Sequence, residues 1–483
     1  MFWVLLLISV LIAYVLFRIH WYMGKVQNYP GKLPIIGHLH KFLGNSIDLW
    51  NLLKNVAETS LKTGEVLVLH FSEYIPAYVV TDPDDCAKIL NNANHKPIVL
   101  RKYTRNYLGQ GILFGPVSVW KDHRKLLNPT FNQQILHSFI DNFNVQSRQL
   151  IIDLEETVGN GPFDHRLYLE KNALRTICAT ALDADISNEY SDECLKSFQE
   201  ILNIIIERFL NFHYFFDCFY NRSGLRKQEQ QFIGNTHVFA ESILQKKRTE
   251  IGNMSVEDGL TDAKFKPFIY QLLQQEHVTL TERQVKDEIN VMILAGFETS
   301  ATILLYTLIL VGTYPHIQQK IFEEIEEVFG DIDRDVSKED LAKLKYIEAV
   351  LKETTRYCPV GPITGRKLLS DVQLKNTVLK KGFNCMLMLY GAMRHPIWGP
   401  DADQYMPERW LDPDRLPKNP HAYMAFGYGK RNCIGKTYAI VSMKVVMVHI
   451  FRHYKVTGDF SKVQLKFMGL LKPHSGHHIN IEY

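Results

Sequence analysis

The sequence has few features that would tie it to disulfides, metal clusters or nucleic acid. Its seven cysteines are odd in number and scattered, with no C-x-x-C pair, which argues against a disulfide framework and a zinc cluster. The formal net charge of +3 is too small an excess to indicate a nucleic-acid partner. No internal repeat or low-complexity tract is present. These absences favour a globular protein facing a reducing compartment, and a chain that is 46% hydrophobic has ample material for a large core.

The chain begins with an apolar stretch. The first 17 residues are almost entirely apolar, and a helix of that length is close to the short limit for crossing a bilayer. A cleaved signal peptide is the alternative, but no Lys or Arg precedes the stretch and no A-x-A site follows it. Basic residues follow from Arg18 onward, so the positive-inside rule places the body of the protein in the cytosol. We expect a single membrane anchor over residues 1–20.

A proline-rich segment follows the expected anchor. Residues 29–37 contain two prolines and two glycines, which excludes a helix there and predicts a stiff linker that ends in a turn. We assign residues 21–37 to this hinge. The pattern over residues 66–81 is rich in valine and predicts strands, so we expect a small sheet near the N-terminus.

A long helix is predicted near the middle of the chain. Thr281 to Gln284 form a capping-box sequence, and apolar residues then recur at helical spacing to about Gly312. Within this helix, residues 295–300 read AGFETS. Burying an acid and two hydroxyls in an apolar helix is costly without a purpose. The structural alternative is that the hydroxyls bond back to their own helix, which is common for Thr and Ser.

One cysteine lies in a loop suited to binding a metal. Residues 426–435 read FGYGKRNCIG, and a Cys433 thiolate would be a strong ligand for haem iron if it were kept deprotonated and dry. Gly429 and Gly435 would let backbone N–H groups approach the sulfur. Arg431 would lower the pKa of the thiol and suit a haem propionate. The alternative is a buried, inert cysteine, which is the usual fate of a free Cys.

This loop matches F-x-x-G-x-R-x-C-x-G at every fixed position and resembles the haem-binding signature of the cytochrome P-450 superfamily. The AGFETS segment similarly resembles the family's oxygen-activation motif. The resemblance implies a mainly α fold with small β-sheets, in which haem b lies between the long central helix and the cysteine loop. Cys433 would be the proximal iron ligand, and Phe426 would shield its sulfur. Glu298 and Thr299 would deliver protons during oxygen activation, while a small residue nearby would leave room for dioxygen.

Position 295 departs from one branch of the family. In many related fatty-acid hydroxylases a glutamate at the matching position bonds covalently to the haem. Here the residue is Ala295, which borders the haem in this interpretation and cannot form an ester. We therefore expect haem b to be held without a covalent link other than the Cys433–iron bond.

Weaker motifs follow in the family's order. Trp120 and Arg124 are four residues apart and share a helix face. In the family such a pair hydrogen-bonds the haem propionates, as does an arginine that matches Arg366. Lys121 and Lys125 beside the pair would steer an acidic reductase, although a solvated helix face is the simpler explanation.

Glu353 and Arg356 form an E-x-x-R element. Taken alone this spacing usually means a surface salt bridge. In the family the pair is joined by an arginine from a later segment, and Arg409 is the match here. A buried network of this kind would be structural rather than catalytic, and we expect its loss to release haem.

Residues 38–483 are expected to form one catalytic domain, although length alone suggests about three. The finer similarity of residues 108–113 and 120–131 points to the microsomal family-four group of insects and vertebrates. The leading hypothesis is a haem-thiolate monooxygenase of the endoplasmic reticulum membrane with a cytosolic catalytic domain. It would insert one oxygen atom from O2 into a lipophilic substrate, such as a fatty acid, hormone or xenobiotic. Electrons would come from NADPH through NADPH–cytochrome reductase, or from a cytochrome b-type donor.

Two alternative functions remain open. A haem-thiolate isomerase or dehydratase would rearrange a lipid peroxide without a reductase. Glu298 and Thr299 favour the monooxygenase, because a peroxide substrate arrives with its oxygens already reduced. The other alternative is a haem-binding or membrane protein without catalysis, against which the complete motifs argue.

The stretch over residues 201–220 is strongly apolar and aromatic. Core packing is its default interpretation. The family resemblance makes it a lid over the substrate channel, which would favour apolar substrates.

Overall fold

The computed structural model describes residues 3, 6, 9, 10, 14, 26–71, 75–186, 188–253 and 267–483. Most of the anchor predicted for residues 1–20 therefore lies outside the described residues, as does the first part of the hinge predicted for residues 21–37. The five described residues of the anchor region are all helical and exposed.

The chain divides into two compact units, each assembled from segments far apart in the sequence. The first unit comprises Met1–Ile98, Gly361–Gln404 and Pro417–Asn432. The second comprises Val99–Val360, Tyr405–Leu416 and Cys433–Tyr483. Helices dominate and the sheets are small, which confirms the predicted fold class. The single catalytic domain over residues 38–483 stays a prediction.

The first unit contains a five-stranded sheet. Its strands, in spatial order, are β1 (Gln27–Asn28), β2 (Leu67–His70), β3 (Pro76–Val80), β7 (Asn384–Leu387) and β4 (Thr364–Lys367). Strands β2 and β3 are antiparallel, and β3 pairs in parallel with β7, whose Met386 lies opposite Val79. The strands predicted over residues 66–81 are thus confirmed where the structure describes them. This unit also contains α2 (Ser46–Thr63), α3 (Pro83–Asn92), β5 (Val372–Gln373), β6 (Val378–Leu379) and α17 (Leu389–Ala392), together with short 3-10 turns.

Local signals explain where the helices of the first unit begin and end. Asn45 forms a capping box with Asp48 at the start of α2, and Gly64 ends that helix in the left-handed conformation at φ 67°. Asp82 caps α3 by accepting from two backbone N–H groups of the first turn. The core that joins the sheet to α3 is apolar and buried, and it includes Tyr78.

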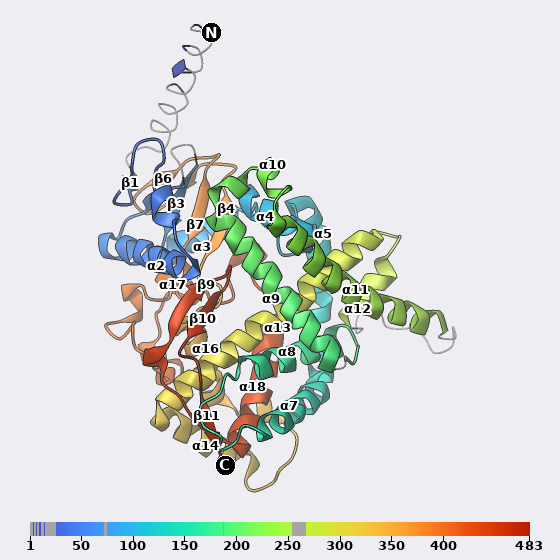
Figure 1. Cartoon of the computed structure of the whole chain (residues 1–483). Helices are drawn as coiled ribbons and strands as arrows, with labels where there is room; N and C mark the ends of the chain where they lie inside the picture. Colours follow the sequence, from blue (N-terminus) through green and yellow to red (C-terminus); the bar gives the residue numbers. More distant parts are fainter. Residues whose placement is uncertain are drawn as a thin grey trace. The chain divides into compact units, whose positions relative to one another are not determined.

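The second unit is mainly helical (Figure 1). Its helices are α4 (Ile98–Leu108, of which Ile98 belongs to the first unit), α5 (Val117–Leu127), α6 (Gln133–Ser138), α7 (Ile140–Glu155), α8 (Arg166–Ala181), α9 (Asn188–Leu210), α10 (Asp217–Tyr220), α11 (Gly224–Asn253), α12 (Phe268–Gln275), α13 (Glu282–Thr313), α14 (Pro315–Phe329), α15 (Lys338–Leu341), α16 (Lys345–Tyr357) and α18 (Lys436–His453). Its strands form two antiparallel pairs, β8 (Lys455–Thr457) with β11 (Asn480–Glu482) and β9 (Gln464–Phe467) with β10 (Leu471–Ser475).

Helix α13 is the predicted central helix and the core of the second unit. The capping box is present, because the Thr281 hydroxyl accepts from the Gln284 N–H and the Gln284 side chain accepts from the Thr281 N–H. The helix packs against α8, α16 and α18 (Figure 1). Among the helices that the structure describes, it alone is long and apolar enough to span a membrane, but 83% of its most apolar window is buried in protein. It is therefore a core helix.

Candidate active site

Cys433 lies between the turn η9 (Gly429–Arg431) and the start of α18. Its side chain is accessible to solvent, yet protein surrounds it closely enough that burial raises the pKa of the thiol. The cysteine is thus accessible to solvent although nearby protein atoms partly desolvate its thiol. The Gly435 N–H donates a hydrogen bond to the sulfur and lowers the pKa, as do the nearby charges of Arg124 and Lys436. The effect that the sequence assigned to Arg431 on this thiol stays a prediction.

Gly429 allows the loop before Cys433 to pack closely against its own unit. Its φ is 72°, and a Cβ at this position would lie 2.6 Å from the carbonyl oxygen of Leu90 near the end of α3. Only glycine avoids both the unfavourable backbone angle and this overlap. Phe426, at the start of the loop, is half-buried, and its role in shielding the sulfur stays a prediction.

The AGFETS segment of α13 presents three different faces. Ala295 is exposed and Thr299, one turn later, is half-buried, although most residues around them on this helix are buried. The Thr299 hydroxyl donates to the Ala295 carbonyl oxygen at 2.8 Å, so the back-bonding expected of helical threonine is present. Its oxygen can still accept a hydrogen bond from a ligand. Ala295 and Thr299 therefore form an accessible strip on an otherwise buried helix.

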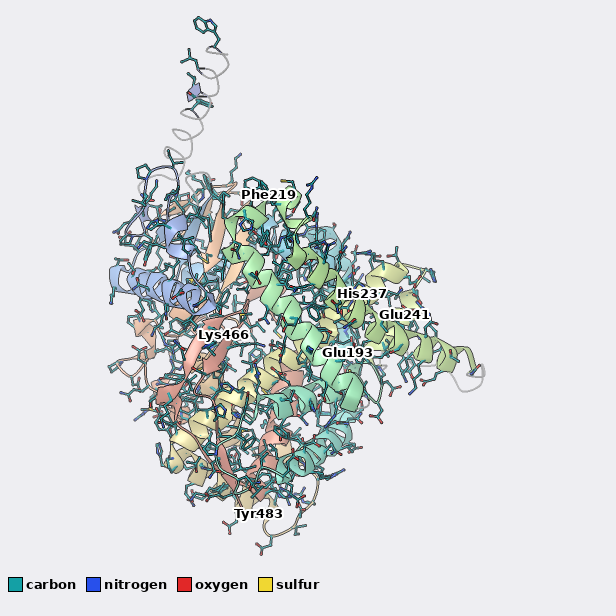
Figure 2. The ribbon with its side chains drawn as sticks, in the orientation of Figure 1. Glu193, Phe219, His237, Glu241, Lys466 and Tyr483 are labelled. Atoms are coloured by element: carbon teal, nitrogen blue, oxygen red, sulfur yellow. The ribbon has the colours of Figure 1, made fainter. Side chains whose placement is uncertain are left out.

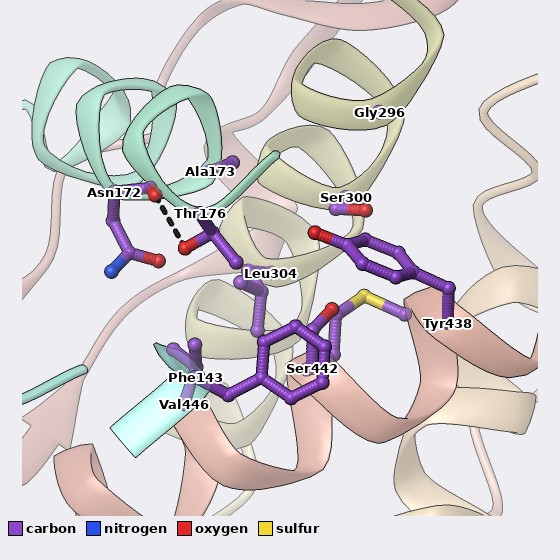
Figure 3. Close-up of a pocket in the computed structure, with 11 residues that line it drawn as sticks. Phe143, Asn172, Ala173, Thr176, Gly296, Ser300, Leu304, Tyr438, Ser442 and Val446 are labelled. Atoms are coloured by element: carbon purple, nitrogen blue, oxygen red, sulfur yellow. Dashed lines mark hydrogen bonds between the residues drawn. The ribbon is translucent and has the colours of Figure 1, made fainter. Parts of the chain in front are cut away.

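A second face of the segment packs against α8. A Cβ on Gly296 would lie 2.5 Å from a side-chain carbon of Ile177, so the glycine serves helix packing, and Ala295 is the small residue on the accessible strip. Ser300 lines a small pocket with Thr176 and Tyr438, between α8, α13 and α18 (Figure 3). The third face carries Glu298, which is buried.

The predicted W-x-x-x-R pair lies on α5. Trp120 is 5% exposed, and Arg124 is half-buried with its Nε donating to Asn128 Oδ1 at 2.7 Å. Burial lowers the pKa of Arg124, and the Cys433 sulfur acts against that shift. The structure thus brings Arg124 within electrostatic range of Cys433. The neighbouring lysines of this helix, at positions 121 and 125, are exposed, as a solvated helix face would be.

Sequence reasoning missed a buried pair that joins α5 to α13. His123 Nδ1 lies 2.5 Å from Glu288 Oε1, and both side chains are almost fully buried. Burial raises the pKa of Glu288, while its contact with His123 acts in the opposite direction. The only sequence signal for this pair is an acid within the apolar pattern of the central helix. Its effect is to hold the helix that carries Trp120 and Arg124 against the helix that carries Thr299.

Three cations gather in the first unit. Arg366 is 2% exposed, and burial lowers its pKa to about 10. Its Nη1 donates to Thr364 Oγ1 at 3.0 Å and to the Gly365 carbonyl oxygen at 2.8 Å, whereas its Nε is buried without a hydrogen-bond partner among the described residues. Burial, together with the charges of Arg366 and Arg431, also lowers the pKa of Lys96 well below its usual value. Sequence reasoning missed Lys96.

These residues fit a haem group. Two arginines beside a buried lysine, one of them with a buried N–H left to donate, favour a carboxylate ligand, which a haem propionate would supply. An accessible cysteine sulfur beside a backbone N–H suits an iron ligand. In the part of the chain that the structure describes, no cluster of three or more His, Cys, Asp or Glu side chains could hold a metal ion.

The E-x-x-R element and the later arginine come together in the second unit. Arg356 donates to Glu353 through Nε at 2.8 Å and Nη2 at 2.7 Å, and Arg409 donates through Nε at 3.1 Å. The side chains of these three residues are 0% exposed. The Trp410 indole N–H and the Met406 backbone N–H also donate to Glu353, at 3.0 Å and 2.9 Å. The network therefore ties α16 to the turn η7 (Pro407–Trp410).

An accessible cysteine sulfur at the start of a helix, and a long helix with an accessible Ala–Thr strip, are features that a haem-thiolate protein requires. A family model described as Cytochrome P450 matches residues 28–481. The chain belongs to the cytochrome P450 family and is a cytochrome P450 monooxygenase. Members of this family bind haem through a cysteine–iron bond.

Curated relatives agree with this assignment. Cytochrome P450 4V2 of Mus musculus is 27% identical over 471 residues, covering 94% of this chain and 89% of the relative. Probable cytochrome P450 4ac1 of Drosophila melanogaster is 27% identical, with coverages of 90% and 85%. Cytochrome P450 4d1 of Drosophila simulans is 28% identical, with coverages of 90% and 88%. Their names confirm the predicted similarity to the family-four group.

Haem should be fully extractable from this protein. Ala295 offers no carboxylate for an ester link, so denaturation in acidified organic solvent should transfer all of the haem to the organic phase. The measurement is a haem stain of the polypeptide on a denaturing gel after extraction. Haem that stays with the polypeptide would contradict the prediction and would indicate attachment through another residue.

Proposed function

We propose that this protein is a membrane-bound monooxygenase that inserts one atom of O2 into a lipophilic substrate, with Cys433 as its iron ligand. Electrons would come from NADPH through a flavoprotein reductase. The observation that carries the proposal is the Cys433 sulfur, which is accessible within a surrounding protein matrix and accepts a hydrogen bond from the Gly435 N–H. A thiolate held in this way is suited to donate electron density to iron.

In this proposal bound haem would activate dioxygen, and residues of the chain would bind the haem and deliver protons. Trp120 and Arg124 of α5 would hydrogen-bond the propionates, as would Arg366 and Arg431. Their side chains bring several N–H donors and three positive charges, which suit the two carboxylates of haem b.

In this proposal two residues of α13 deliver protons. Thr299 would accept and pass on a proton beside the accessible strip, and Glu298 would connect it to the proton supply. The arrangement supports these roles, because the Thr299 hydroxyl lies next to the small side chain of Ala295 while Glu298 is buried one position earlier on the same helix.

Exposed aromatic side chains support a lipophilic substrate and contact with a membrane. Phe212, Phe216 and Phe219 are 47%, 46% and 58% exposed. They lie on or beside the turn η3 (Phe212–Phe215) and α10, where Figure 2 labels Phe219. Clustered exposed apolar side chains favour a lipid or ligand interface. Four described residues of the predicted anchor are also exposed large hydrophobic side chains (Trp3, Leu6, Val10 and Tyr14). We propose an N-terminal anchor in the endoplasmic reticulum membrane and a cytosolic catalytic domain.

The carbon monoxide difference spectrum of the reduced, detergent-solubilised protein tests the proposed ligand. A strongly red-shifted Soret band is expected, because a thiolate ligand would donate electron density to the iron. A band at the position of a histidine-ligated or thiol-ligated haem, in folded protein, would overturn the proposal. A substrate screen with reductase would follow, and product formation that needs no NADPH would favour the isomerase or dehydratase alternative.

Thr299→Ala should leave haem bound but divert electrons from product to hydrogen peroxide. With a substrate from the screen, we expect product formation to fall about 100-fold, the lower end of what a positioned proton-transfer group contributes. The measurement is product and hydrogen peroxide per NADPH consumed. Thr307→Ala is the matched control, because Thr307 bonds back to Ile303 on the same helix at 2.8 Å but is fully buried. Equal coupling in the Thr299 variant and the wild type would remove Thr299 from the proton route.

A further inference from the structure

The charge partner of Glu298 comes from the C-terminal hairpin. Lys472 on β10 contacts Glu298 Oε1 through its Nζ, and the two side chains are 9% and 0% exposed. The other oxygen, Oε2, is buried without a hydrogen-bond partner in the part of the chain that the structure describes. Glu298 is therefore a buried carboxylate with a cationic neighbour and one oxygen left to bond elsewhere.

Other charged groups surround the pair from α8 and β9. Glu170 on α8 acts to raise the pKa of Lys472, and Arg166 acts to lower it. Burial is the largest effect and brings that pKa to about 8. Lys466 on β9, labelled in Figure 2, is the cross-strand partner of Lys472. Two lysines opposite each other repel, so the carboxylates offset an otherwise unfavourable arrangement.

Glu170 is the second buried acid of this group. It is 4% exposed, and burial raises its pKa while Lys472, Arg166 and a hydrogen bond from Gln199 oppose that shift. The Gln199 Nε2 donates to Glu170 Oε2 at 2.6 Å. Asp164 adds a further negative charge near Glu170, and it is itself paired with His477 at 3.1 Å.

These charges form a set that runs outward from Glu298. Lys472 contacts Glu298, Glu170 lies within electrostatic range of Lys472, and Arg166 lies within range of both Glu170 and Lys472. The Arg166 side chain is 37% exposed. Glu298 thus lies at the inner end of a set of charges that reaches solvent.

A buried carboxylate without a counter-charge takes up a proton, because desolvation penalises its charged form. Among the described residues, Lys472 is the cation that forms an ion pair with Glu298. Its loss would leave a buried acid with no compensating charge in contact. The charge state of Glu298 therefore depends on a residue far away in the sequence.

We propose that Lys472 is a positioning residue for the reaction, which holds Glu298 as a carboxylate and so keeps it able to take up a proton and pass it towards Thr299. This inference rests on the proposed function, since it assigns Glu298 to the proton route. In each cycle the carboxylate gains one proton from the solvent side and releases one towards Thr299, so that its charge is restored.

The charge state of Glu298 can be measured directly by infrared spectroscopy of the haem-loaded protein. Subtracting the Glu298→Gln spectrum should show an ionised carboxylate in the wild type at neutral pH. The same subtraction in a Lys472→Met background should show the band of a protonated carboxylic acid. Lys472→Arg keeps the charge and should keep the carboxylate ionised. An ionised Glu298 in the Lys472→Met protein would overturn the proposal. A protonated Glu298 in Lys472→Arg or in the wild type would also overturn it. These last two measurements keep the proposal falsifiable if Lys472→Met does not fold.

The pH profile of turnover provides the second readout. In Lys472→Met, burial that favours the protonated form of Glu298 by about tenfold would leave roughly a tenth of the molecules with an ionised Glu298. Turnover at neutral pH would then fall about tenfold. Below about pH 8, where Lys472 of the wild type stays charged, the turnover of the wild type should be flat while that of Lys472→Met rises with pH. Lys472→Arg should restore the flat profile. Lys466→Met is the matched control on the paired strand, and an equal effect there would overturn a specific role of Lys472. The infrared result does not depend on turnover. If the wild type showed no NADPH-dependent oxidation, the proposed function would be wrong, but the charge state of Glu298 could still be tested.

Discussion

Replacing Cys433 with serine should abolish monooxygenation and remove the red-shifted Soret band of the carbon monoxide complex. Serine is smaller and its hydroxyl stays protonated where a thiolate would form, so the electron-rich ligand that we propose for the iron would be lost. We expect product formation to fall by roughly 100-fold or more, which corresponds to about 2.7 kcal/mol of lost transition-state stabilisation. The measurements are the difference spectrum and the rate of product formation per haem.

Cys218→Ser is the matched control for this change. Cys218 and Cys433 are both free and exposed, whereas the other five cysteines are buried. The control should keep the spectrum and the activity of the wild type. Cys433→His tests whether any iron ligand suffices, and we expect it to bind haem without the thiolate spectrum. Full activity in either Cys433 variant would overturn the ligand assignment.

Replacing Glu353 with glutamine should prevent accumulation of folded, haem-loaded protein. Glu353 accepts hydrogen bonds from Arg356, Arg409 and Trp410 in a network whose charged side chains are fully buried. Its loss leaves two buried guanidinium ions without this counter-charge, and removing one partner from a buried pair costs about 3–5 kcal/mol. This is a large fraction of the roughly 5–15 kcal/mol by which proteins are stable. The measurements are the yield of soluble haem protein and the midpoint of urea unfolding.

Glu58→Gln is the control for the buried network. Glu58 and Lys54 form an exposed pair on α2, with a separation of 3.8 Å and side chains that are 42% and 46% exposed. Breaking an exposed pair costs at most about 1 kcal/mol, so the yield should match the wild type. Wild-type yield and stability in Glu353→Gln would show that the network does not hold the fold.

Local features of the chain were predictable because their causes lie within a few residues. Thr281 and Gln284 cap α13 by bonding to each other, and Pro315 opens the next helix directly after α13 ends. The residues of the network around Glu353 were predictable only through the family resemblance, because no local rule links Glu353 to Arg409.

The sequence by itself determined the ends of the central helix and the family, and it predicted the cysteine of the haem loop, since each depends on neighbouring residues or on a short motif. Only the tertiary structure decided which charges meet. Lys472 lies against Glu298, and Lys96 lies within electrostatic range of Arg366 and Arg431. These partners are far apart in the chain, and a charged residue carries no local sign of its partner. The chain packing determines whether each is exposed to water or buried beside another charge, and that difference sets its ionisation.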